Sequence, residues 1–279
     1  SQIGATTMAS AHTTLCTIDM PTYTPTASIM GLPISTASHD EALRRMGEVI
    51  ACHGEGHYIS ITNTESMYQG LHDTKHGDYI RQADFSLCDG VGVILAGWAW
   101  GHRIERFTGP MLQLEACDKG RAHQWRHFFY GGKEGVAEEL ARRLKAKYPG
   151  LIVCGTHCPP FRETGAPEDN DVVDMINAAK PDIVWVGLGL PKQERWISDH
   201  RHRIHAPWMI GVGAAFDYHA GTVPWAPPAL RAVGLEWLFT FLLQPRLRAR
   251  RYWRSLLFVL DMAGRGLLSL RFLRLLRRP

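Results

Sequence analysis

No stretch of this 279-residue sequence stays apolar over the roughly 20 residues that a membrane-spanning helix requires. The first 25 residues are rich in Ser, Thr, Ala and Pro and lack the apolar segment of a signal peptide, so we expect a disordered arm over 1–25. Cysteines are few and scattered, and no second Cys or His pair joins Cys154 and Cys158 to complete a zinc set. Reduced thiols in a cytosolic protein are the better interpretation.

Lysine is absent from residues 231–279, and acidic residues there number only two. The same segment holds eleven arginines and a net charge of +9, which leaves −5 for the rest of a chain whose total is +4. This asymmetry indicates an anionic partner: a membrane surface, a pyrophosphate or a nucleic acid. Because Leu, Phe, Trp and Tyr alternate with the arginines, we expect a basic amphipathic segment over 231–279 that binds an anionic membrane surface, and no nucleic-acid partner.

Upstream of that segment, strand and helix patterns alternate. Strands are predicted at 28–35, 58–63, 85–90, 127–132, 151–155, 182–189 and 207–213, and helices at 39–52, 91–100, 133–150, 169–180 and 191–201. The alternation predicts an α/β fold over residues 26–230, with a Rossmann-like, mostly parallel sheet covered by helices on both faces. Ligands of such sheets bind at the carboxyl ends of the strands, where this sequence places glycines and polar side chains.

Asp89 ends one of these apolar strands and precedes a glycine. A carboxylate there can accept the proton of an attacking hydroxyl, as a general base does. The alternative is a helix N-cap for the helix that begins at Val91, and spacing alone slightly favours the cap.

Three further motifs could bind a substrate. Gly131-Gly132 lies between a strand and a helix, where bare N–H groups bind phosphate, although tight turns use glycine anyway. Gln193, in the first turn of the helix after Gly189, can hold a sugar hydroxyl or a base edge, and the alternative is a solvated helix start. Arg106 could pair with a phosphate or carboxylate, or form a surface salt bridge with Glu105 or another neighbour.

Metal and nicotinamide sites are less well supported. Asp169-Asn170-Asp171 opens a helix, where aspartates favour the helix dipole, and no carboxylate is spaced to complete a site with His200, His202 and His205. We therefore predict no metal and no cofactor. A nicotinamide-dependent oxidoreductase is the alternative from another class, but it needs an acidic residue about 20 positions beyond a full glycine fingerprint, and none is placed convincingly.

Taken together, the motifs between about Ile29 and Arg248 resemble the WecG/TagA/CpsF family of bacterial glycosyltransferases. The matching pieces, in order, are Thr62-Asn63-Thr64-Glu65, Asp89-Gly90, Glu105-Arg106-Phe107-Thr108-Gly109, Phe129-Tyr130-Gly131-Gly132, Tyr148-Pro149-Gly150, Gly187-Leu188-Gly189-Leu190-Pro191-Lys192-Gln193-Glu194, Gly211-Val212-Gly213-Ala214-Ala215-Phe216-Asp217, Ala220-Gly221 and Gly234-Leu235-Glu236-Trp237-Leu238. The sequence departs from the family at Trp225, Thr240 and Ile61, where members often carry Arg, Arg and Thr.

The resemblance implies an inverting, metal-independent transfer from a UDP-sugar to a sugar on a polyprenyl-pyrophosphate lipid. It makes Asp89 the catalytic base and places Asn63, Arg106 and Gln193 in the pocket. With the neighbouring motif residues, the predicted substrate site comprises Thr62, Asn63, Arg106, Gly131, Gly132, Gly189, Lys192, Gln193, Glu194, Phe216 and Asp217. The pyrophosphate and the membrane are assigned to Arg246, Arg248, Arg250, Arg251 and Arg254.

The family contains several donor specificities. We expect a hexose from UDP-glucose, as in exopolysaccharide synthesis, with N-acetylmannosamine or N-acetylmannosaminuronate as the alternative. The resemblance also implies a peripheral location on the cytoplasmic face of the bacterial inner membrane, and self-association as a possible homo-oligomer.

Overall fold

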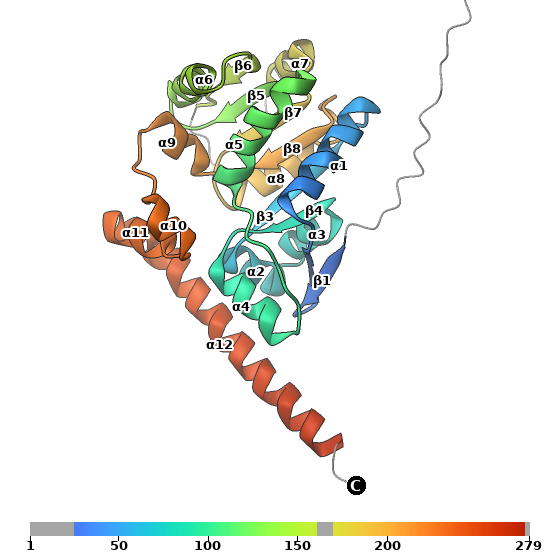
Figure 1. The fold of residues 1–279 in the computed structure, drawn as a ribbon, viewed down its shortest axis with the longest axis vertical. Helices are drawn as coiled ribbons and strands as arrows, with labels where there is room; N and C mark the ends of the chain where they lie inside the picture. The colour runs from blue at the N-terminus through green and yellow to red at the C-terminus, as the bar shows by residue number, and fades with distance from the viewer. Residues whose placement is uncertain (1–24, 161–169, 277–279) are drawn as a thin grey trace, which may run out of the picture.

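The computed structural model describes residues 25–160 and 170–276 and shows an α/β fold (Figure 1). Six parallel strands form one sheet in the spatial order β4-β3-β8-β7-β5-β6. Their bounds are β3 (His57–Thr62), β4 (Phe85–Cys88), β5 (Arg126–Gly131), β6 (Ile152–His157), β7 (Ile183–Gly187) and β8 (Trp208–Gly211). The expected fold class is confirmed.

Helices cover both faces of this sheet. One apolar cluster joins the sheet to α1 (His39–Ala51), α5 (Gly109–Lys119), α6 (Val136–Lys147) and α9 (Ala215–Ala220). A second cluster joins the opposite face to α2 (Thr64–His72), α3 (Thr74–Gln82), α4 (Val91–Ala99), α7 (Asn170–Ala179) and α8 (Lys192–His200). A short 3₁₀ helix, η1 (Gly120–His123), follows α5. Strand side chains alternate between the clusters, as Trp185 and Val186 of β7 do.

The segment predicted as one strand at 28–35 is instead a hairpin. Strand β1 (Thr26–Ile29) pairs antiparallel with β2 (Leu32–Ser35), and Ile29 faces Leu32 across a two-residue turn. Both turn residues, Met30 and Gly31, have positive φ angles of 53° and 87°. Such turns match the twist of paired strands, so the apolar run folds back on itself and covers the second cluster.

The chain reverses its direction across the sheet between β5 and β7. From β5 it proceeds outward to β6, whereas from β7 it proceeds the other way to β8. Connections that diverge in this way leave a crevice at the carboxyl ends of the two strands, where open α/β sheets bind ligands.

Three further helices follow the sheet: α10 (Pro228–Ala232), α11 (Glu236–Leu243) and α12 (Pro245–Leu276). Figure 1 shows α12 running past α2 and α4 and extending beyond the rest of the fold. Phe258 of α12 is fully buried in the second cluster, which attaches the helix to the domain. Within the described residues, no helix is both long enough and apolar enough to cross a membrane.

Candidate functional site

Asp89 lies beside Asn63 at the ends of two adjacent strands. Thr62 and Cys88 are in register, and the Asp89 N–H donates to the Thr62 carbonyl at 3.0 Å. Asn63 is the N-cap of α2, where its Oδ1 accepts from the Ser66 N–H at 3.0 Å. The Asn63 side chain also hydrogen-bonds to the Asp89 carboxyl. Since Oδ1 is already an acceptor, the Asn63 amide NH₂ is the donor to Asp89.

The helix-cap interpretation of Asp89 is wrong. The N-cap of α4 is Gly90, and no side chain caps that helix. Asp89 is half-buried, and burial raises the pKa of its carboxyl to about 7, against the lowering effect of the Arg251 charge. Glu236 raises this pKa further, whereas Arg106 and the Asn63 hydrogen bond lower it. A carboxyl with a pKa near neutrality is suited to proton transfer at physiological pH.

Arg106 lies beside the end of β4 because its backbone continues the sheet. Arg106 forms an isolated parallel bridge with Cys88, and the next residue, Phe107, donates its N–H to the Cys88 carbonyl at 2.8 Å. The guanidinium does not pair with Glu105. Its Nη2 donates to Glu236 Oε2 at 2.7 Å, and its Nη1 donates to the Arg231 carbonyl at 2.8 Å. Arg106 therefore links the edge of the sheet to the start of the basic tail.

Tail arginines fall into two groups. The charges of Arg248 and Arg251 act on Tyr218 of α9, whose pKa burial raises to about 12, and Arg251 also acts on Asp89. Arg246 and Arg250, in contrast, are exposed. Arg248 and Arg251, three residues apart, share the side of the helix whose charges act on Tyr218, whereas Arg246 and Arg250, four residues apart, share an exposed side.

Arg254 shares an ion-pair partner with Arg251. It pairs with Glu65 of α2, with Arg254 Nη1 at 3.3 Å from Glu65 Oε1.

The three departures from the family pattern are all accounted for in this structure. Trp225 donates its Nε1–H to Glu236 Oε1 at 2.8 Å, and the Arg231 guanidinium stacks on its ring at 3.7 Å. Thr240 is buried and hydrogen-bonds to the backbone of α11. Ile61 lies in the first apolar cluster.

The glycine turns at the ends of β5 and β7 lie side by side. Gly131 and Gly187 are in register, and the Gly132 N–H donates to the Gly187 carbonyl at 3.0 Å. A Cβ on Gly131, whose φ is 125°, would lie 2.6 Å from the Gly187 carbonyl carbon. A Cβ on Gly187 would lie 2.7 Å from the ring of Phe216. These glycines are needed for packing as well as for leaving backbone accessible at the crevice.

Gln193 and Glu194 lie at the neighbouring strand end. Gly211 of β8 admits the Gln193 amide, since a Cβ there would be 2.8 Å from Gln193 Nε2. That Nε2 donates to Glu194 Oε1 at 3.2 Å, while Gln193 Oε1 and Glu194 Oε2 are buried without a partner in the described structure. Burial raises the pKa of Glu194 to about 7. Unpaired buried acceptors at the carboxyl ends of the strands, where open α/β sheets bind ligands, can accept from a ligand's hydroxyl or N–H groups.

The other predicted site residues are placed as follows. Thr62 and Phe216 are fully buried. The Thr62 hydroxyl hydrogen-bonds to the hydroxyls of Ser60 and Ser86, and the Phe216 ring packs against the glycine turns. Both side chains therefore support the site from the core and do not line it. Asp217 is half-buried and accepts from the Thr222 hydroxyl at 2.9 Å. Gly189, with φ of 76°, and Lys192 are half-buried around the start of α8.

Comparison with known proteins identifies the family of this chain. Residues 27–271 match the glycosyl transferase WecG/TagA/CpsF family. The chain belongs to this family. It is therefore a glycosyltransferase, and the nicotinamide-dependent alternative is set aside.

Three relatives are N-acetylglucosaminyldiphosphoundecaprenol N-acetyl-beta-D-mannosaminyltransferases. The chain is 31% identical to that of Bacillus spizizenii over 204 residues, which cover 73% of this chain and 76% of the relative. It is 30% identical to that of Bacillus subtilis, over 68% of this chain and 73% of the relative. It is 29% identical to that of Staphylococcus aureus, over 67% and 72% respectively.

Sequence reasoning missed three residues around the WecG/TagA/CpsF site: Glu65, Tyr218 and Glu236. Glu65 and Glu236 stand inside motifs shared with the family, so the motifs contained the signal. Their partners, Arg251 and Arg106, are far away in the sequence. Tyr218 lies one position beyond a shared motif, and nothing in the sequence pattern indicated that it belongs to the site.

The remaining sequence candidates lie away from this site. Asp169 is outside the described residues. His200 is buried and its Nδ1 bonds to the Trp196 carbonyl, while His205 pairs with Glu55. His202 contacts Arg201, and no three ligating side chains come together in the part of the chain that the structure describes.

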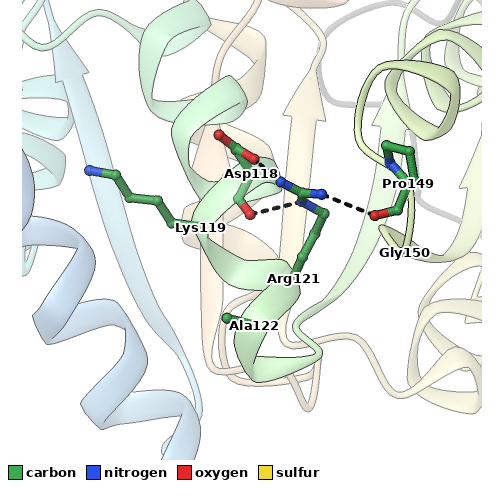
Figure 2. Close-up of a pocket in the computed structure, with 6 residues that line it drawn as sticks. All are labelled: Asp118, Lys119, Arg121, Ala122, Pro149 and Gly150. Carbon is green, nitrogen blue, oxygen red and sulfur yellow. Dashed lines mark hydrogen bonds and ion pairs between the residues drawn. The ribbon is translucent and has the colours of Figure 1, made fainter.

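A surface depression also lies apart from the glycosyltransferase site (Figure 2). It is bordered by the end of α5 and by the Pro149-Gly150 turn, next to the amino ends of β5 and β6. Its Arg121 already donates to Asp118 and, at 3.0 Å, to the Pro149 carbonyl. Ligands of parallel sheets bind at the opposite, carboxyl ends, so we do not assign a substrate to this depression.

Proposed function

We propose that this glycosyltransferase moves N-acetylmannosamine from UDP to an N-acetylglucosamine carried on a polyprenyl diphosphate. The names of the three relatives described above give this transferred sugar and this lipid-linked acceptor, and they favour N-acetylmannosamine over the glucose expected from the sequence. The observation that carries the proposal is the group of residues at the strand ends, where Asp89 accepts from the Asn63 amide and the charges of Arg106 and Arg251 act on its carboxyl.

In the proposed reaction, Asp89 is the general base. Its carboxylate takes the proton of the acceptor hydroxyl as that oxygen forms a bond to the anomeric carbon of the donor. The bond between that carbon and the UDP oxygen breaks on the opposite side, so the configuration inverts and UDP leaves with the electron pair. The Asn63 amide fixes the orientation of the carboxylate.

Negative charge grows on the departing diphosphate, and cations must offset it. From α12, the charge of Arg251 acts on Asp89 at the strand end and that of Arg248 acts on Tyr218, and the glycine turns of β5 and β7 offer backbone N–H groups. We propose that the donor diphosphate binds at these turns. The two arginines would then offset the negative charge on the diphosphates of the donor and the acceptor. Preorganised donors of this kind commonly contribute about 10²–10³ in rate. No metal and no organic cofactor is required in this scheme.

The outer side of the tail suits an anionic lipid surface. The tail helices carry the exposed Arg246 and Arg250, and exposed apolar side chains occur in the same helices and on α4; they are Leu95, Trp98, Trp237, Leu238, Leu242, Leu243, Trp253, Leu256, Val259 and Leu260. Aromatic and leucine side chains enter the headgroup boundary while arginines contact anionic headgroups. We propose that residues 231–279 hold the protein peripherally on the cytoplasmic face of the inner membrane. Self-association stays a prediction.

The test is UDP release from a panel of UDP-sugars, with and without polyprenyl-diphosphate N-acetylglucosamine, in the presence of EDTA. Acceptor-dependent release from UDP-N-acetylmannosamine, with no comparable release from UDP-glucose, is the expected result. Release from UDP-glucose alone would restore the glucose assignment. A folded protein that releases UDP from no donor with this acceptor would overturn the proposal.

A further inference from the structure

Glu65 forms a bridge between the catalytic domain and two tail arginines. Arg251 Nε lies 3.4 Å from Glu65 Oε2, and Arg254 Nη1 lies 3.3 Å from Glu65 Oε1. The Glu65 side chain is only 12% exposed, against 35% for Arg251. An ion pair this shielded from water is screened far less than a surface pair.

The position of Glu65 in the sequence connects it to the site. It occupies the first turn of α2, two residues after Asn63, which holds the Asp89 carboxyl. Arg251 is therefore attached to the turn that orients Asp89, and its charge is the strongest of those acting on that carboxyl. The first turn of a helix also favours an acidic side chain, because the helix dipole is positive there.

Other contacts hold α12 in place without Glu65. The Thr64 hydroxyl donates to Ser255 at 2.7 Å, and Phe258 is completely buried against the domain. The Tyr252 hydroxyl donates to the Trp237 carbonyl at 2.7 Å and joins α12 to α11. Glu65 is thus not needed to dock the helix. Its contact with Arg251 instead restricts the orientation of the Arg251 guanidinium.

We propose that Glu65 is a positioning residue that fixes the Arg251 guanidinium opposite Asp89. The inference rests on the proposed function, because it assigns Glu65 a role in the reaction of that same site. A reacting group displaced by about 1 Å can cost about 100-fold in rate. Glu65 would act through Arg251 without touching the substrate.

The experiment compares Glu65→Gln with Glu139→Gln in the full chain. Glu139 is the matched control, because it too pairs with two arginines, Arg142 at 2.7 Å and Arg143 at 2.6 Å, but on the outside of α6. We expect Glu65→Gln to lower kcat about 10- to 100-fold with a smaller change in KM, and Glu139→Gln to match the wild type.

The pH profile separates positioning from a purely structural effect. The groups that face Asp89 are Asn63, Arg106, Tyr218, Glu236 and Arg251. Arg251 lowers the pKa of Asp89, so releasing Arg251 should raise that pKa and move the acidic limb of kcat/KM to higher pH. Glu65→Asp keeps the charge but is shorter, and should shift in the same direction by less. This variant serves if Glu65→Gln does not fold.

A double variant gives the decisive result. If Glu65 acts through Arg251, Glu65→Gln should have almost no further effect on kcat in an Arg251→Gln background. Independent, multiplying effects would overturn the proposal, as would a Glu65→Gln enzyme that matches Glu139→Gln in kcat and pH profile. A wild-type protein that transfers no sugar would instead overturn the proposed function itself, so the two failures are distinguishable.

Discussion

The Asp89 carboxyl stands under opposing influences that only the folded chain creates. Burial and Glu236 favour its protonated form, while Arg251, Arg106 and the Asn63 amide favour the carboxylate. Its pKa of about 7 is the outcome of these effects. A base with such a pKa can hold a proton during the reaction and release it to solvent afterwards.

Replacing Asp89 tests this role directly. Asp89→Asn keeps the shape and the Asn63 contact but cannot accept a proton, so kcat should fall about 10²–10⁴-fold. The thermal unfolding temperature should show that the variant is folded, and Glu139→Gln controls for the loss of one acidic charge. Unchanged turnover would remove Asp89 from the role of base.

Glu194 offers a test of stability against pH. Its pKa is raised from 4.5 to about 7 by burial, so the folded state binds its proton more tightly than the unfolded state does. Stability from this group is therefore complete below about pH 4.5 and is lost as the pH rises through about 7. Glu194→Gln, which is always neutral, should unfold at a higher temperature than the wild type at pH 8, and the difference should disappear near pH 4. Exposed Glu134→Gln is the control, and a difference independent of pH would contradict the assignment.

Individual residues show how much of the site could be predicted from the sequence. Asp89 could be placed at a strand end from its neighbours, but base and cap were indistinguishable because both fit the same spacing. The partner of Arg106 could not be found, since Glu236 lies 130 positions away. Thr62 and Phe216 belong to shared motifs, yet only the structure shows that their side chains point into the core.

Among the elements, strands were easier to predict than the helices between them. Buried parallel strands form continuous apolar runs such as Ile183–Gly187, which stand out in a sequence. Helices α2, α3, α5 and α9 were not predicted, and α2 and α3 follow one another with Asp73 alone between them, so no loop composition marks where one ends and the next begins. The hairpin β1-β2 was read as one strand because its turn contains only Met30 and Gly31.

The close approach of the paired ends of β5 and β7 predicts a severe effect of one added methyl group. Gly131→Ala places a Cβ 2.6 Å from the Gly187 backbone at a φ of 125°, so the strands must separate. We expect a loss of at least about 1–3 kcal/mol of unfolding free energy, measured by urea denaturation, together with loss of transfer. Gly264→Ala is the control: it lies within α12 with nothing within 4 Å, and should be neutral or stabilising by about 1 kcal/mol. Equal stability of the Gly131→Ala and wild-type proteins would contradict the packing argument.

At the scale of the whole molecule, we propose that one side of the tail faces the site and that another side faces an anionic membrane surface. Trp253 and Leu260 are 61% and 59% exposed, so the double variant Trp253→Ser/Leu260→Ser should fold normally. It should bind anionic vesicles more weakly in co-sedimentation, because less apolar area enters the headgroup boundary. Met175→Ser, at a 41% exposed position on α7, is the matched control and should bind as the wild type does. Undiminished binding of the double variant would remove this side of α12 from the membrane contact.

The separation of charge along the chain also has a kinetic consequence. Residues 231–279 carry +9 and the rest of the sequence −5, and α12, which contains most of those arginines, extends beyond the rest of the fold, so the molecule is an electric dipole (Figure 1). In the field of an anionic surface a dipole experiences a torque, which turns the positive end forward before any contact is made. At physiological ionic strength this field decays over about 8 Å, and dilute buffer lengthens its reach. Collisions with such a surface are therefore aligned in advance, and added salt makes them increasingly random.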